Sequence, residues 1–245
     1  MFNDHLIGYA AAMPMAGKVS RSEAGGRARH RKPRGMGFER RGEILAAARE
    51  MFIAEGYGTV TTRKLAERAG ISQTGLYVYF KNKEEILDAL CRATFEQLAA
   101  RFRRVEAKNG SYPDLLRRIG KAYVEFALEH PDEYELTFMA SGSLPKFSAP
   151  KDLARPFELQ GVGVQVFMIL REHVANMAKA GLLGKIDVTL ASQVLWAGLH
   201  GMVALLIARP GYLMSGRRQL ADTMIETLIA GLQASRQWKE YSIVQ

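Results

Sequence analysis

The chain has 245 residues, of which 48% are hydrophobic and 24% charged, a balance that excludes a wholly disordered protein. Its 34 Lys and Arg residues against 25 Asp and Glu residues give a formal net charge of +9. The single cysteine, Cys91, excludes an intramolecular disulfide and a zinc site built from several cysteines. Such cysteine usage is typical of a reducing compartment.

Residues 1–37 are predicted to form a flexible basic arm, because they lack sustained apolar periodicity and are rich in glycine. The first 41 residues hold nine Lys and Arg against three acidic residues, so they carry +6 of the net charge. This favours a polyanion as partner, since basic side chains on phosphates release counterions. A solvated tail without a partner is the alternative. The apolar stretch 6–17 follows Asp4 and His5 and is interrupted by Pro14, so we expect no secretory signal and a cytoplasmic protein.

Beyond the arm, apolar spacing predicts an all-α chain of about nine helices, without convincing strands. Helical periodicity begins at Phe38 and should end at Gly56. Two short helices follow, capped by Thr61 or Thr62 and by Ser72, and Asn82 should cap a long helix to about residue 107. Further helices are expected over residues 113–130, 132–140, 157–181, 187–208 and 216–237, with a loop over 141–156.

Residues 61–80 have the spacing of a helix-turn-helix, in which a turn at residues 70–72 separates two short helices. The inward positions are apolar, whereas the outward ones are polar: Arg63, Lys64, Gln73, Thr74 and Tyr77. Gln73 can bond two atoms of an adenine, and Arg63 can bind a guanine or a phosphate. The hydroxyls of Thr62 and Tyr77 suit phosphate oxygens, and Lys83 lies at a helix start that attracts phosphate. A helical hairpin with a polar face is the alternative.

The segment TTRKLAERAGISQTGLYVYFKNKEEILDAL, residues 61–90, strongly resembles the DNA-binding module of the tetracycline-repressor (TetR) family. Together with the amphipathic segment 39–55, the resemblance covers about residues 39–90. It implies a DNA-binding domain over 38–84 and an effector-binding and dimerisation domain over 85–245. Carried over by position, it implies DNA contacts from Thr62, Arg63, Gln73, Thr74, Gly75, Tyr77, Tyr79 and Lys83.

The chain departs from this family at residues 74–75. Gly or Pro followed by Thr, Ser or Ala is common there, whereas this chain has Thr74-Gly75. Glycine in a helix costs about 1 kcal/mol relative to alanine. We also expect Gly75 to remove a side chain from the recognition face, so the resemblance does not predict the operator sequence.

Trp196-Ala-Gly-Leu-His200-Gly201 resembles the W-x-x-x-H-G signature of one class of TetR C-terminal domains. Trp196 and His200 share one helix face, where they could contact a ligand or belong to the core. The resemblance places an effector cavity among the central helices of this domain. Its candidate lining is Phe102, Phe126, Tyr134, Phe138, Phe167, Trp196 and His200, with Tyr123, Met139 and Met168 as further candidates.

The resemblance also places the last two helices in a four-helix homodimer interface. The candidate interface residues are Leu195, Leu199, Val203, Leu220, Met224 and Leu228. The apolar segment 188–208 is long enough to cross a bilayer, but a buried bundle helix is the expected explanation.

These observations predict a dimeric regulator of transcription, most simply a repressor that a small apolar or amphipathic effector releases from a double-stranded DNA operator. No cofactor, metal site or catalytic residue is expected, because HExxH, GxSxG, P-loop and dinucleotide motifs are absent from the sequence. The alternatives are an accessory protein that binds DNA without sequence preference through its arm, an enzyme, and a membrane-anchored protein.

Overall fold

The computed structural model describes residues 37–139, 162–184, 186–212 and 215–234. Every described residue belongs to one compact unit, residues 35–245. The predicted arm up to residue 36 and the predicted loop over 141–156 lie outside the described residues. So do residues 157–161 and 235–237 of the predicted later helices.

Within these ranges the chain is helical and has no strand, which confirms the all-α prediction. The helices are α1 (Gly37–Glu55), α2 (Thr62–Arg68), α3 (Gln73–Tyr77), α4 (Lys83–Glu106), α5 (Tyr112–Glu129), α6 (Pro131–Tyr134), α7 (Val162–Lys179), α8 (Val188–Ala208) and α9 (Arg217–Ala234). The predicted helix over 132–140 differs, because after α6 the chain continues as a π-helix, η1 (Glu135–Met139). The helix predicted from the Ser72 cap through Phe80 is also shorter than expected, since α3 ends at Tyr77.

Side-chain caps explain where the helices near the N-terminus begin. The side-chain oxygens of Thr61, Ser72 and Asn82 accept hydrogen bonds from backbone N–H groups in the first turns of α2, α3 and α4, at 3.3, 3.0 and 2.8 Å. Each cap satisfies a backbone donor that the helix itself leaves unpaired. The starts of these three helices are therefore specified locally, as the sequence predicted.

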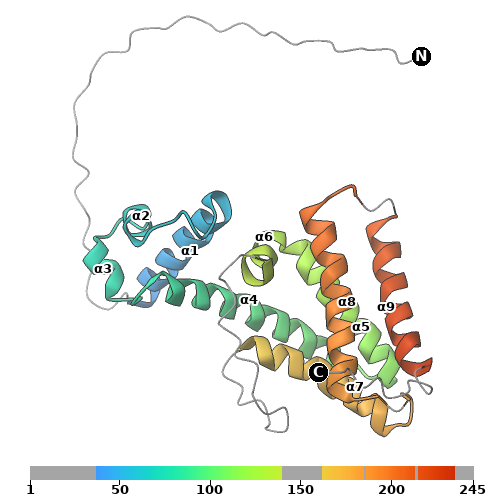
Figure 1. Cartoon of the computed structure of the whole chain (residues 1–245). Helices are drawn as coiled ribbons and strands as arrows, with labels where there is room; N and C mark the ends of the chain where they lie inside the picture. The colour runs from blue at the N-terminus through green and yellow to red at the C-terminus, as the bar shows by residue number, and fades with distance from the viewer. Residues whose placement is uncertain (1–36, 140–161, 185, 213–214, 235–245) are drawn as a thin grey trace, which may run out of the picture. The chain divides into compact units, whose positions relative to one another are not determined.

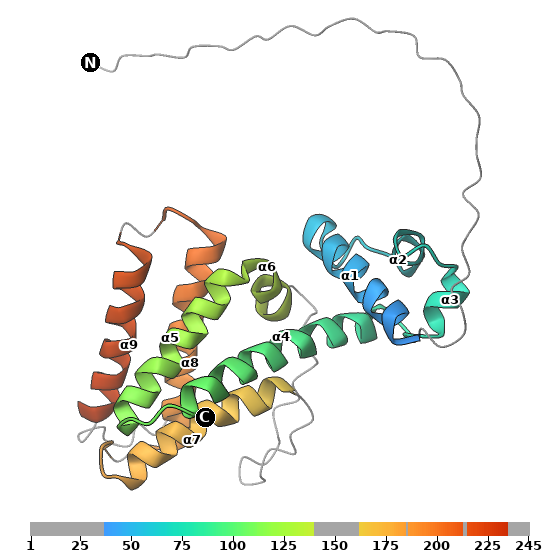
Figure 2. The same ribbon diagram turned by 180° about the vertical axis from the view of Figure 1, so that it is seen from behind.

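Two apolar cores organise the described residues. One joins α1, α2 and α3 to the first half of α4, and it includes Ile44, Phe52, Leu65 and Leu76. The other joins the second half of α4 to α5, α7, α8 and α9. Both views show α4 running from the group of α1, α2 and α3 to the group of α5 and α7 (Figures 1 and 2). Because α4 contributes to both cores, it is a continuous link between them.

The segment α6–η1 is a second link between the two cores. Tyr134 is fully buried in the C-terminal core, whereas Leu136, two residues later, is buried in the N-terminal core. Glu133 also forms an ion pair of 3.1 Å with Arg49 of α1. The nine residues of α6 and η1 therefore contact both parts of the described chain.

Helix α8 is the one described helix that is long and apolar enough, by composition, to cross a membrane. It packs against α5, α7 and α9, and seven of its residues are buried there. This packing agrees with the predicted bundle helix.

Candidate nucleic-acid interface and ligand pocket

Three predicted DNA-contacting side chains meet on the exposed side of α2 and α3. The Gln73 Nε2 amide donates to Thr62 Oγ1 at 3.3 Å and to the Tyr77 hydroxyl at 3.4 Å, and these two hydroxyls lie 3.4 Å apart. Thr62 lies on α2, before the turn, whereas Gln73 and Tyr77 lie on α3, after it. The helix-turn-helix therefore brings the three side chains together. These hydrogen bonds, the one to Thr62 foremost, lower the pKa of Tyr77 below its ordinary value.

The remaining outward residues leave this face polar. Arg63 and Thr74 are exposed, and Tyr79 is half-buried because it packs against the N-terminal core. Sequence reasoning missed Val78, which follows Tyr77 and is 77% exposed. An exposed apolar side chain beside polar ones suits contact with a thymine methyl group. The missing signal was the early end of α3, which turns Val78 outward.

Lys83 has a structural role that the sequence did not predict. Its ammonium donates to the backbone carbonyls of Tyr57 and Val60 at 2.8 and 2.9 Å, and it lies 4.2 Å from the centre of the Tyr57 ring. Lys83 therefore holds the loop between α1 and α2 against the first turn of α4 through these two hydrogen bonds. One of its three N–H groups remains for a phosphate.

Gly75 lies close to the side chains of the turn that precedes α3. A Cβ atom there would lie 3.1 Å from Ser72 Oγ and 3.7 Å from Ile71 Cβ. Ser72 Oγ is held in place because it accepts the Gly75 N–H. A side chain at position 75 would therefore press on the cap of α3, while the expectation that Gly75 removes a side chain from the recognition face stays a prediction.

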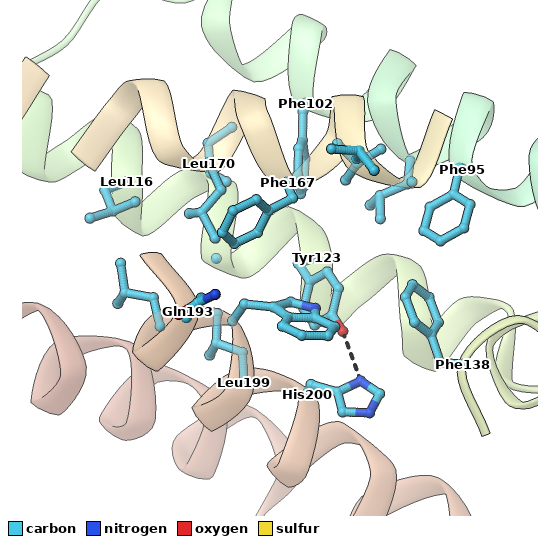
Figure 3. Close-up of a pocket in the computed structure, with 18 of the residues that line it drawn as sticks. Phe95, Phe102, Leu116, Tyr123, Phe138, Phe167, Leu170, Gln193, Leu199 and His200 are labelled. Carbon is cyan, nitrogen blue, oxygen red and sulfur yellow. Dashed lines mark hydrogen bonds between the residues drawn. The ribbon is translucent and has the colours of Figure 1, made fainter. Parts of the chain in front are cut away.

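A pocket of about 630 Å³ lies in the C-terminal core (Figure 3). Its walls come from α4, α5, η1, α7, α8 and α9, and its lining is mainly aromatic and aliphatic. Five of the seven predicted ligand-binding residues line it: Phe102, Phe138, Phe167, Trp196 and His200. Tyr123 also lines it, whereas Met139 and Met168 do not.

Two predicted ligand-binding residues do not line this pocket. Phe126 is buried and borders a different, open cleft between α4 and α5. Tyr134 is fully buried behind the pocket wall. Sequence reasoning also missed the aliphatic lining residues, including Leu116, Ile119, Leu170 and Ile229, because their spacing is the same as that of ordinary core residues.

Polar side chains in the pocket wall bind one another. The Tyr134 hydroxyl lies 2.5 Å from His200 Nδ1 and 2.8 Å from the Tyr123 hydroxyl. The Tyr123 hydroxyl is itself 3.3 Å from His200 Nδ1, a contact marked by the dashed line in Figure 3. Burial raises the pKa of both tyrosines well above the ordinary value, although a side-chain hydrogen bond with Trp196 acts against this at Tyr123. The Trp196–His200 pair therefore holds Tyr123 and Tyr134 as well as lining the pocket, and we call these four residues the wall network.

Cys91 lines the same pocket but has no nucleophilic character. Burial raises the pKa of its thiol to about 11, although a hydrogen bond with the Thr137 side chain lowers it in part. A thiol with this pKa stays protonated near neutral pH, and the thiolate is the reactive form.

We expect acid to destabilise this protein in part through His200, whose pKa burial lowers below 6.5. The unfolded chain then binds more protons, so this contribution to stability is complete above about pH 6.5 and is lost as the pH falls below it. The thermal unfolding midpoint should therefore drop between about pH 7.5 and pH 5.5. In the variant His200→Asn the unfolding midpoint, measured by circular dichroism, should fall less over this pH range than in the wild type. An equal fall in both proteins would mean that His200 does not contribute to the acid sensitivity.

The α8 part of the predicted dimer seam is corrected by the structure. Leu195, Leu199 and Val203 are buried inside the chain, and the first two line the pocket. The predicted α9 residues Leu220, Met224 and Leu228 are partly buried against the same core. Helix α8 is apolar on nearly every side, so its sequence could not indicate which face turns inward. Its exposed apolar positions are instead Leu190, Trp196, Ala197, Gly201, Leu205 and Ala208.

Family models match both parts of the chain. Residues 44–90 match the model described as bacterial regulatory proteins of the tetR family, and residues 116–228 match a tetracyclin repressor-like C-terminal domain.

Curated relatives are similar to the chain over part of their lengths. The HTH-type transcriptional repressor KstR2 of Mycobacterium tuberculosis is 34% identical over 117 residues, which cover 46% of this chain and 58% of that protein. The HTH-type transcriptional activator FasR of Mycolicibacterium smegmatis is 33% identical, covering 48% of this chain and 52% of that protein. The nucleoid occlusion factor SlmA of Vibrio vulnificus is 30% identical, covering 58% of this chain and 71% of that protein. The chain thus spans a little over half the length of the first two.

Solved structures match a larger share of the chain. The fatty acid degradation regulator FadR from Bacillus halodurans has a TM-score of 0.59 and 17% identity, covering 82% of this chain and 98% of that one. The ketosteroid transcriptional regulator KstR2 of Mycobacterium tuberculosis has a TM-score of 0.55 and 25% identity, covering 79% and 94%. At 17% identity, the likeness to FadR shows the fold alone.

Proposed function

This chain belongs to the TetR family of bacterial regulatory proteins, and from that membership we propose that it is a cytoplasmic, homodimeric repressor of transcription that a small apolar or amphipathic effector releases from its operator. We place its C-terminal domain in the W-x-x-x-H-G class, because Trp196 and His200 act together in the wall network. We propose that the pocket binds the effector and does not catalyse a reaction of it.

The observation that carries this proposal is the polar face of the helix-turn-helix. Gln73, Thr62 and Tyr77 hydrogen-bond to one another on the exposed side of α2 and α3, and α3 is short enough to enter a major groove. Arg63 beside them supplies positive charge for a base edge or a phosphate. The domain boundary proposed near residue 84 falls at the start of α4, the helix that continues into the other core.

Effector binding is proposed to reach the DNA-binding helices by two routes. One is a tilt of α4, which lines the pocket with Phe95 and Phe102 and contributes Leu87 to the N-terminal core. The other is the α6–η1 segment, in which Phe138 lines the pocket while Leu136 packs in the N-terminal core. The effector must bind the DNA-incompetent arrangement more tightly for either route to operate.

The test is binding to DNA that flanks the protein's own gene, at two salt concentrations and with excess random duplex. A sequence-reading regulator keeps its complex against the competitor, whereas a purely electrostatic binder loses it. A reporter gene behind the bound site then separates repression from activation. Binding that random duplex abolishes, and that deletion of residues 1–36 also abolishes, would favour the accessory-protein alternative, for which the basic arm is the supporting feature.

We expect the homodimer to form through the exposed faces of α8 and α9. On α8 this face carries Ala197, Gly201 and Leu205, whose small or apolar side chains allow two helices to pack closely. Ala197→Glu should therefore convert the dimer to a monomer, as measured by analytical ultracentrifugation, because it buries like charges across a twofold axis. Glu96→Gln, at an exposed position on α4, is the control and should leave the dimer intact. If the Ala197→Glu protein remained a dimer, this face of α8 would not be the dimer interface.

A further inference from the structure

We propose that the part of the effector enclosed by the pocket is uncharged, an apolar body without a carboxylate, phosphate or ammonium group. This inference rests on the proposed role of the pocket as the effector site, and it restricts the class of molecule that the site accepts.

The charges around the pocket are the first argument. Among the described residues that line it, Asp88 and Arg92 are the two that carry a formal charge. They have opposite signs, they lie one helical turn apart on α4, and both are exposed to solvent. They therefore leave no net charge at the mouth and place no counter-ion in the interior.

The interior polar groups are the second argument. Tyr134 and Tyr123 hydrogen-bond to each other and to His200 Nδ1, so the two hydroxyls and one ring nitrogen already have partners. Burial lowers the pKa of the His200 imidazole below its ordinary value, which favours the neutral ring. The wall network therefore offers dipoles, but it offers no charge that could neutralise an ionic ligand.

The rest of the lining strengthens this conclusion. Rings and aliphatic chains from five helices and η1 surround a volume of about 630 Å³, which is within the range of sites for drug-sized molecules (Figure 3). An ion moved from water into such surroundings loses hydration and gains no counter-ion from the described residues of the interior, which is strongly unfavourable. An uncharged molecule of the same shape loses far less, so the pocket should distinguish the two.

The experiment compares probes of equal shape and different charge. Dodecan-1-ol and methyl dodecanoate are matched against dodecanoate and dodecylammonium, and methyl 2-naphthoate is matched against 2-naphthoate as a rigid pair. Binding is followed by Trp196 fluorescence in the full-length Trp238→Phe variant, because the chain has two tryptophans and Trp196 lines the pocket. We expect the neutral member of each set to bind at least about tenfold more tightly than its ion.

Three outcomes are decisive. A carboxylate or ammonium probe that binds as tightly as its neutral partner overturns the inference, and so does a failure of every probe to bind. Weak dodecanoate binding that Arg92→Ala abolishes supports it, because the charge then lies at the mouth and not inside. Operator binding is measured separately in the same preparation, so a neutral-selective pocket in a protein without an operator would refute the proposed function and leave this inference standing.

Discussion

Replacing Gln73 with alanine is expected to lower affinity for a specific operator by about 5- to 150-fold, because one good side-chain contact to a base contributes about 1–3 kcal/mol of discrimination. Gln73 is exposed at the start of α3, and its amide N–H groups are directed at Thr62 and Tyr77. In a bidentate contact to adenine, its carbonyl oxygen would accept from the N6 amino group, and one amide N–H would leave Thr62 or Tyr77 to donate to N7. Affinity for random duplex should barely change, since phosphate contacts dominate that mode.

The measurement is a titration of wild type and variant against the operator and against every single-base change in it. Gln73→Ala should flatten the preference at one base pair of each half-site. Tyr77→Phe is the matched comparison, because it removes a hydroxyl suited to phosphate and should weaken binding to all sequences alike. A Gln73→Ala protein with unaltered operator affinity would remove Gln73 from the base-reading residues.

Truncating Leu136 to alanine is expected to destabilise the folded protein by about 2–5 kcal/mol, the usual cost of removing a buried leucine side chain. Leu136 is 6% exposed, and although it lies on η1 it belongs to the apolar core built from α1, α2, α3 and the first half of α4. The loss should therefore appear in the DNA-binding helices and reduce operator affinity as well.

Hydrogen exchange of the backbone amides of α1 tests this location. Leu206→Ala is the control, since Leu206 is equally buried but belongs to the C-terminal core alone. We expect both variants to lose stability in denaturant titrations, but faster exchange in α1 only for Leu136→Ala. Equal α1 protection in the two variants would mean that the α6–η1 segment does not support the DNA-binding helices.

Local features determined much of this fold, and these were readable from the sequence. Thr61, Ser72 and Asn82 cap helices because their side chains bond the backbone three residues ahead, an interaction that needs no distant partner. The helix-turn-helix face could be predicted for the same reason, since Thr62, Gln73 and Tyr77 lie within sixteen consecutive residues. The aromatic side chains of the pocket were found through their composition and through the family resemblance.

Tertiary packing alone decided the remaining features. Helix α8 is apolar all round, so only its neighbours α5, α7 and α9 determine that Leu195 and Leu199 face the pocket while Ala197 and Gly201 face outward. Lys83 carries no sequence signal for the carbonyls of Tyr57 and Val60, because they lie more than twenty residues away along the chain. The contact of Leu136 with the N-terminal core likewise depends on where α4 carries the C-terminal helices. Apolar periodicity indicates that a side chain is buried. It does not indicate which helix packs against that side chain, because this depends on contacts between residues that are far apart in the sequence.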